Sequence, residues 1–93
     1  MPSRRHAEVL GCIAANVRRL REKKGLTQEA LAAAAGLDLS YEQRVERAAT
    51  NLSIAVLVTL AEALDVPPAR LLRAARMPRI VRGRPRKVAR KTA

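Results

Sequence analysis

Tyr41 is the only aromatic residue in this chain of 93, which contains neither Phe nor Trp. The hydrophobic residues, 48% of the total, are therefore almost all Leu, Val, Ile and Ala. Strands are enriched in aromatic and β-branched residues, whereas Ala and Leu are strong helix formers. The composition thus favours an all-α fold. The length allows one small domain, whose core has to be economical or completed by a second subunit.

Apolar residues recur at helical spacing along most of the chain. Leu10, Ile13 and Val17 predict a first helix from about Ala7 to Lys24, and Gly25 then stops the pattern. Four shorter helices are expected after it, which makes five within residues 7–76. Their starts are marked by three capping residues and one proline pair, namely Thr27, Asp38, Ser53 and Pro67–Pro68.

The second and third predicted helices are both short, and Gly36 lies between them. A capped helix of about two turns, a glycine turn and a second short helix are what a helix-turn-helix needs, because the turn has to bring the two helices to a steep crossing. One of the two can then lie in the DNA major groove.

The residues of this region carry a more specific signal. The stretch GLTQEALAAAAGLDLSYEQRVERAATNLSIAVLVTLAEALDV resembles the Xre and phage-repressor (Cro/CI-type) family, with G-L-T-Q-x-x-L-A, A-G-L, an apolar-E-R step and N-x-S in this order. The resemblance covers about residues 13–72. It implies a lambda-repressor-like helix-turn-helix domain that regulates transcription by binding double-stranded DNA. The run ERAATNLSI is also similar to the controller proteins of restriction-modification systems, a branch of that family.

The resemblance also implies roles for single residues. Gln28 matches a glutamine that binds a backbone phosphate, at a helix start where backbone amides attract an anion. Arg21 and Glu46 match an internal ion pair between the first and third helices, which has a packing use with or without DNA. Thr27 and Ser53 would also be helix caps in any helical protein. The candidate DNA-binding residues of the domain are Thr27, Gln28, Leu39, Ser40, Tyr41, Gln43, Arg44, Asn51 and Ser53.

Three residues depart from the family pattern. Glu42 stands where the family usually has Ile, Val or Leu, and an unpaired carboxylate in the core would be costly. We therefore expect Glu42 to rotate outward or to pair with a neighbour such as Arg18. Leu39 and Thr50 stand where controller-type relatives often have arginines, so the DNA sequence that is bound cannot be taken from a relative.

Positive charge is concentrated at the C-terminal end. Residues 70–93 contain ten of the nineteen Lys and Arg residues and no acid, in a chain of net charge +11. Residues 77–93 lack an apolar face, so we expect a flexible tail that needs a partner to become ordered. The segment RGRPRK resembles the core of an AT-hook, which lies in the narrow minor groove of A/T-rich DNA; the alternative is a generic basic arm. The tail candidates for DNA binding are Arg82, Gly83, Arg84, Arg86 and Lys87.

Other functions find less support in the sequence. His6 and Cys12 are each the only residue of their type, so we expect no catalytic site, metal or cofactor. No apolar run approaches the roughly 18 residues of a membrane span, and we expect a cytoplasmic, nucleoid-associated protein. RNA is a less suitable partner, because there are no aromatic side chains for base stacking beyond Tyr41.

The sequence allows two kinds of protein partner besides DNA. A homodimer through the fourth and fifth helices is expected, because Leu57, Leu64, Leu71 and Leu72 offer more apolar surface than so small a domain needs. The alternative function is an antitoxin or protein-interaction module that docks a partner protein, with DNA binding secondary.

Overall fold

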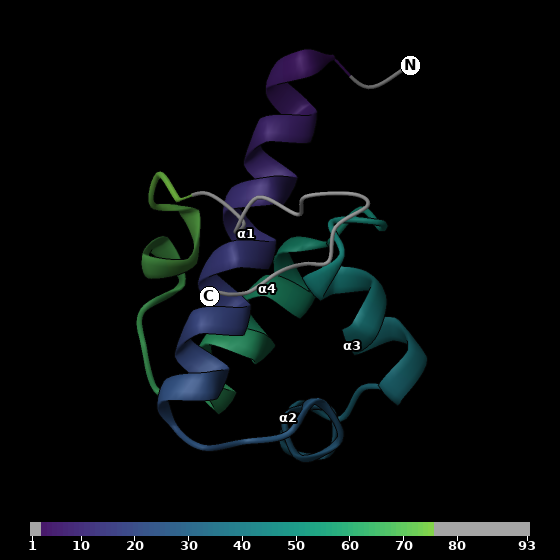
Figure 1. Cartoon of the computed structure of the whole chain (residues 1–93), viewed down its shortest axis with the longest axis vertical. Helices are drawn as coiled ribbons and strands as arrows, with labels where there is room; N and C mark the ends of the chain where they lie inside the picture. Colours follow the sequence, from purple (N-terminus) through teal and green to yellow (C-terminus); the bar gives the residue numbers. More distant parts are fainter. Residues whose placement is uncertain (1–2, 76–93) are drawn as a thin grey trace, which may run out of the picture.

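Four α-helices and one 3₁₀-helix make up the fold in the computed structural model, which describes residues 3–75. They are α1 (Arg4–Lys23), α2 (Gln28–Ala35), α3 (Leu39–Glu46), α4 (Ile54–Ala63) and the 3₁₀-helix η1 (Pro68–Leu72). The N-terminal half of α1 stands clear of the body, while the other helices gather around its C-terminal half (Figure 1). The all-α prediction is confirmed for this part of the chain.

Side chains at the helix starts explain why the short helices begin where they do. The Thr27 hydroxyl accepts a hydrogen bond from the Ala30 amide at 3.0 Å, and the Ser53 hydroxyl accepts one from Val56 at 3.1 Å. Asp38 occupies the N-cap position of α3, but its side chain makes no capping hydrogen bond. Gly36 ends α2 with a φ of 69°, a left-handed conformation that suits glycine. The two helices of the motif are therefore separated by a tight turn.

The fifth predicted helix is a 3₁₀-helix of five residues rather than an α-helix. Asn16 of α1 ties the end of this element to α1: it is 1% exposed and donates to the carbonyl oxygens of Leu71 at 3.0 Å and Arg73 at 2.9 Å. Arg70 Nη1 donates in turn to Asn16 Oδ1 at 3.2 Å. Because α1 satisfies these carbonyls, no further helical turn is needed to do so.

The core consists of aliphatic side chains from all five elements. Leu57, Leu64 and Leu71, which we expected to provide spare apolar surface, are buried in it, so that expectation was wrong. Without Phe or Trp, the domain builds its own core largely from leucines, namely Leu20, Leu31, Leu57, Leu60, Leu64 and Leu71. Among residues 3–75, the large hydrophobic residues that remain exposed are Val9, Leu39, Ile54 and Leu72.

No helix in the described range is both long and apolar enough to cross a membrane. The predicted tail, residues 77–93, lies outside the described residues. The same is true of its candidate DNA-binding residues, Arg82, Gly83, Arg84, Arg86 and Lys87.

Candidate nucleic-acid interface

Helix α3 has an outward face and an inward face. Leu39 and Ser40 are exposed, and Tyr41, Gln43 and Arg44 are partly exposed, whereas Glu42, Val45 and Glu46 are buried. The inward residues lie three and four positions apart, the spacing of one side of a helix. The five sequence candidates on α3 are therefore all accessible to a ligand.

Tyr41 connects Arg44 to the segment that follows α3. The Arg44 guanidinium lies over the Tyr41 ring, 5.3 Å from its centroid, which suits a cation–π contact. The Tyr41 hydroxyl donates to the carbonyl oxygen of Asn51 at 3.4 Å. The sole aromatic residue thus restricts the directions in which Arg44 can extend.

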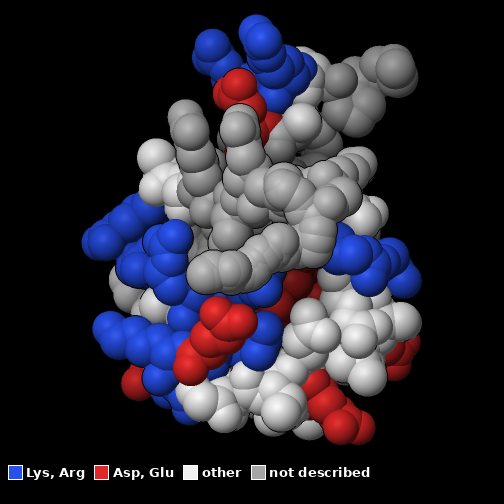
Figure 2. Space-filling model, viewed as in Figure 1, with Lys and Arg blue, Asp and Glu red and all other residues white. Residues whose placement is uncertain are grey.

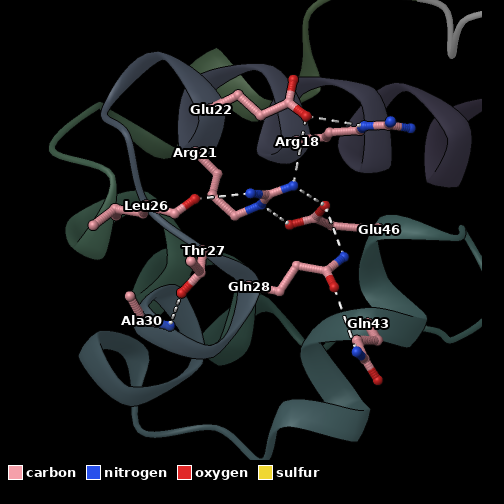
Figure 3. A network of polar contacts seen from close by, with 9 residues as sticks. All are labelled: Arg18, Arg21, Glu22, Leu26, Thr27, Gln28, Ala30, Gln43 and Glu46. Carbon is pink, nitrogen blue, oxygen red and sulfur yellow. Dashed lines mark hydrogen bonds and ion pairs between the residues drawn. The ribbon is translucent and has the colours of Figure 1, made fainter.

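Arg21 binds Glu46 through two hydrogen bonds behind α3 (Figure 3). Arg21 Nε lies 2.7 Å from Glu46 Oε2, and Nη2 lies 3.1 Å from Oε1. Its remaining nitrogen, Nη1, donates to the Leu26 carbonyl at 2.8 Å. The guanidinium therefore links α1, α3 and the segment before α2, and the structure brings together the two residues that the resemblance pairs.

The Glu46 carboxylate also binds α2, the first helix of the helix-turn-helix (Figure 3). Gln28 Nε2 donates to Glu46 Oε1 at 3.2 Å, and Gln28 Oε1 accepts from Gln43 Nε2 at 3.4 Å. Two candidate DNA-binding residues, Gln28 and Gln43, are thus joined to each other and to the buried ion pair. The positions of Gln28, Gln43 and Glu46 in the sequence did not predict these hydrogen bonds.

Glu42 neither rotates outward nor pairs with Arg18, so both sequence-based expectations were wrong. Its side chain is fully buried, and neither carboxyl oxygen has a hydrogen-bond partner among the described residues. Arg18 pairs instead with Glu22 of its own helix, with Nε and Oε2 3.5 Å apart. Burial raises the pKa of Glu42 to about 9, and the neighbouring Glu46 carboxylate contributes to this shift. Glu42 is therefore accommodated as a neutral, protonated acid.

Glu46 remains the charged member of the two acids. Burial alone would raise the pKa of Glu46, but the hydrogen bonds from Arg21 and Gln28, together with the neighbouring Glu42 carboxyl, outweigh it and hold that pKa below its ordinary value. The site behind α3 therefore holds one carboxylate, one guanidinium and one neutral acid.

The other candidates lie at helix starts and in the loop after α3. The hydroxyls of Thr27 and Ser53 are exposed while they cap their helices. Asn51 is exposed, and its carbonyl accepts from Tyr41. Sequence reasoning missed Arg47, an exposed cation at the C-cap of α3. Arg47 is the last residue of the recognition helix that the sequence predicted at about residues 39–47, and this position was a signal that could have found it.

Basic side chains gather over the lower part of α1 and beside α3, whereas the surface over α2 is largely uncharged or acidic (Figure 2). The described domain therefore offers local basic surface near α3 for a polyanion, rather than an evenly positive surface.

A capped helix, a tight turn and a second helix held at its angle by a buried ion pair define a helix-turn-helix DNA-binding protein. The helix-turn-helix family HTH_3 matches residues 17–71, and the chain belongs to this family.

Relatives agree with this assignment. The chain is 40% identical over 60 residues to the control protein C.SmaI of Serratia marcescens, covering 64% of this chain and 71% of that protein. It is 41% identical over 54 residues to the uncharacterized HTH-type transcriptional regulator y4dJ of Sinorhizobium fredii (strain NBRC 101917 / NGR234), covering 58% and 70%. The crystal structure of the restriction-modification controller protein C.AhdI from Aeromonas hydrophila superposes with a TM-score of 0.65 at 45% identity, covering 67% of this chain and 94% of that one.

The family and these relatives identify the chain as a DNA-binding transcriptional regulator. They favour this function over the protein-docking module that the sequence left open. The family is one of regulators and not of enzymes.

Proposed function

We propose that the chain is a sequence-specific regulator that reads base edges in the major groove with α3. The observation that supports this most strongly is the polarity of α3, whose outward side chains reach the surface while its inward Glu46 is fixed by Arg21. A rigid helix with accessible polar side chains suits base recognition. The proposed base-reading residues are Leu39, Ser40, Tyr41, Gln43 and Arg44.

We propose that residues at the N-terminal ends of α2 and α4 contact the DNA backbone. The N-terminus of α2 offers backbone amides and the Gln28 side chain to a phosphate. The hydrogen bond from Gln43 Nε2 to Gln28 Oε1 is long, 3.4 Å, so Gln28 can readily exchange it for a hydrogen bond to DNA. We propose that Thr27 and Gln28 bind the phosphates on one side of the groove and Asn51 and Ser53 those on the other.

Arg44→Ala is expected to weaken binding to the specific DNA site by about 1 to 3 kcal/mol, because a guanidinium contact to a base edge carries discrimination. Binding to random duplex should change little. The measurement is a titration of both duplexes, with the specific site first selected from a random pool.

Arg5→Ala is the matched control, since it removes the same charge from the exposed end of α1 that stands clear of α2 and α3 (Figure 1). Equal losses on specific and random DNA for Arg44→Ala would contradict the base-reading role.

A homodimer is proposed, because one recognition helix reads only a few base pairs and paired subunits read two half-sites. Ile54 at the start of α4 is 74% exposed, Leu72 at the end of η1 is 48% exposed, and Val9 of α1 is 43% exposed. These three side chains line one apolar hollow. The proposed interface therefore still involves α4 and η1, through residues other than the buried leucines.

Ile54→Lys is expected to convert the dimer into a monomer, because it places a charge in this apolar contact. Sedimentation at high micromolar concentration measures the change. Leu39→Lys is the control, since Leu39 is exposed on α3 and should leave the dimer intact. A wild-type protein that is monomeric at this concentration, or an Ile54→Lys variant that is still a dimer, would contradict the interface.

Two of the similar proteins are controllers, C.SmaI and C.AhdI, and C.AhdI is a controller of a restriction-modification system. We therefore propose that the chain regulates genes of a restriction-modification system, acting in the cytoplasm on nucleoid DNA. Comparing transcription from a neighbouring restriction-modification promoter with and without the protein tests this role; no change in either direction would reject it.

A further inference from the structure

Glu42 is buried in the fold, and its carboxyl oxygens have no hydrogen-bond partner among residues 3–75. It lies on the inward face of the recognition helix, four residues before Glu46, and residues at this spacing are neighbours on a helix. An aliphatic residue would fill this place at lower cost. The question is what an acid contributes there.

The surrounding donors and acceptors restrict the answer. All three guanidinium nitrogens of Arg21 are already bound, two to Glu46 and one to the Leu26 carbonyl. Glu46 accepts from Arg21 and from Gln28, and its two oxygens have further lone pairs. A neutral Glu42 is a donor beside this acceptor, whereas an ionised Glu42 would be a second carboxylate facing the first.

We propose that Glu42 is a positioning residue whose carboxyl, carrying its proton, donates a hydrogen bond to Glu46 and thereby fixes Gln28 and Gln43 for DNA. Glu46 is the shared acceptor of this network: it holds Gln28, and Gln28 holds Gln43. The inference rests on the proposed DNA contacts of these two glutamines. It adds a residue that would not touch DNA itself.

The charged groups acting on Glu42 come from two elements. Glu46 of α3 disfavours its ionisation, and Arg21 of α1, itself 3.8 Å from Glu22, favours it less strongly. Helix α2, which also packs on α3, contributes the uncharged Gln28 amide. Loss of the Glu42 proton would leave two carboxylates to share one guanidinium, and Glu46 would no longer hold Gln28 in place.

The sign of the pH dependence follows from the raised pKa. Between the ordinary value of 4.5 and about 9, the folded protein holds a proton that the unfolded chain has lost. The free energy of unfolding therefore falls as pH rises through this window. DNA affinity, which depends on the protonated folded form, falls only as pH passes about 9.

Three full-length proteins test the proposal: wild type, Glu42→Gln and Glu42→Leu. Gln has the shape of the protonated acid and can donate to Glu46 at any pH, whereas Leu fills the space without a donor. Between about pH 7.5 and about pH 9.5, wild-type affinity for the selected DNA site should fall roughly twofold to fourfold, because only about a quarter of Glu42 is still protonated at the higher pH. Dividing the wild-type affinity by the affinity of Glu42→Gln at each pH removes the effects of alkaline pH on the rest of the protein.

The Leu variant separates positioning from packing. It should bind the site roughly threefold to tenfold more weakly at both pH values, the effect of one lost hydrogen bond. A readout without DNA is the NMR shift of the Gln28 side-chain amide, which should follow Glu42 titration in wild type, stay constant in Glu42→Gln and be displaced in Glu42→Leu.

Identical pH profiles of wild type and Glu42→Gln, or a Gln28 amide unaffected by Glu42→Leu, would overturn the proposal. If wild type shows no preference for any duplex, the DNA-contact roles fail, and the Gln28 amide still decides the role of Glu42.

Discussion

Arg21→Ala is expected to destabilise the fold by about 3 to 5 kcal/mol, because it leaves a buried carboxylate without its cation. The Glu46 side chain is 3% exposed and accepts two bonds from Arg21, so water cannot replace the guanidinium without opening the site. Small domains are stable by about 5 to 15 kcal/mol, so this loss is a large share of the total. Urea unfolding followed by helical circular dichroism measures it.

Arg18→Ala is the matched control for this variant. Arg18 lies one turn earlier on α1 and pairs with Glu22, but the two side chains are 45% and 57% exposed. A surface pair of this kind contributes about 0 to 1 kcal/mol. Equal losses of stability for the two variants would show that the Arg21–Glu46 pair does not hold α1 and α3 together.

Removal of residues 78–93 is expected to weaken DNA binding strongly and without regard to sequence. The segment carries seven Lys and Arg residues and no acid. If about four of them bind phosphates, the slope of log affinity against log salt should become shallower by roughly 3 to 4 per protomer. The preference for the specific site over random duplex should survive. An unchanged salt slope would mean that the tail does not touch DNA.

The AT-hook and the generic basic arm differ in one consequence. If Arg82 and Arg84 enter a narrow minor groove, replacing both with Ala should weaken binding mainly when A/T-rich DNA flanks the site. Replacing Arg90 and Lys91 removes the same charge outside the R-G-R-P segment and should show no such dependence. Equal losses with G/C-rich flanks would reject the hook and leave the basic arm.

Local signals allowed much of the fold to be predicted. Thr27 and Ser53 cap their helices with side-chain bonds, and Gly36 ends α2 at the glycine turn that the sequence predicted. Such features depend on a few adjacent residues, so a single sequence contains the information. The pairing of Arg21 with Glu46 came from the family resemblance, because residues 25 positions apart leave no local signal.

The errors concern environments that only tertiary packing decides. Because an unpaired buried charge is costly, Glu42 was expected to rotate outward or to pair with a neighbour such as Arg18, but that cost is avoided by protonation next to Glu46. Leu71 was assigned to a surface, yet Asn16 draws η1 onto α1 and buries it. No spacing rule indicates which leucines a domain without Phe or Trp needs for its core.

Selection of duplexes from a random pool, run in parallel with wild type and Arg44→Ala, tests the account most directly. Wild type is expected to enrich a two-fold symmetric sequence with half-sites about one helical turn apart. Arg44→Ala should enrich the same sequence with its preference relaxed at one position in each half-site, because one base contact has been lost. Enrichment of no sequence by wild type, or of an identical sequence with undiminished preference at every position by Arg44→Ala, would contradict the reading of DNA by α3.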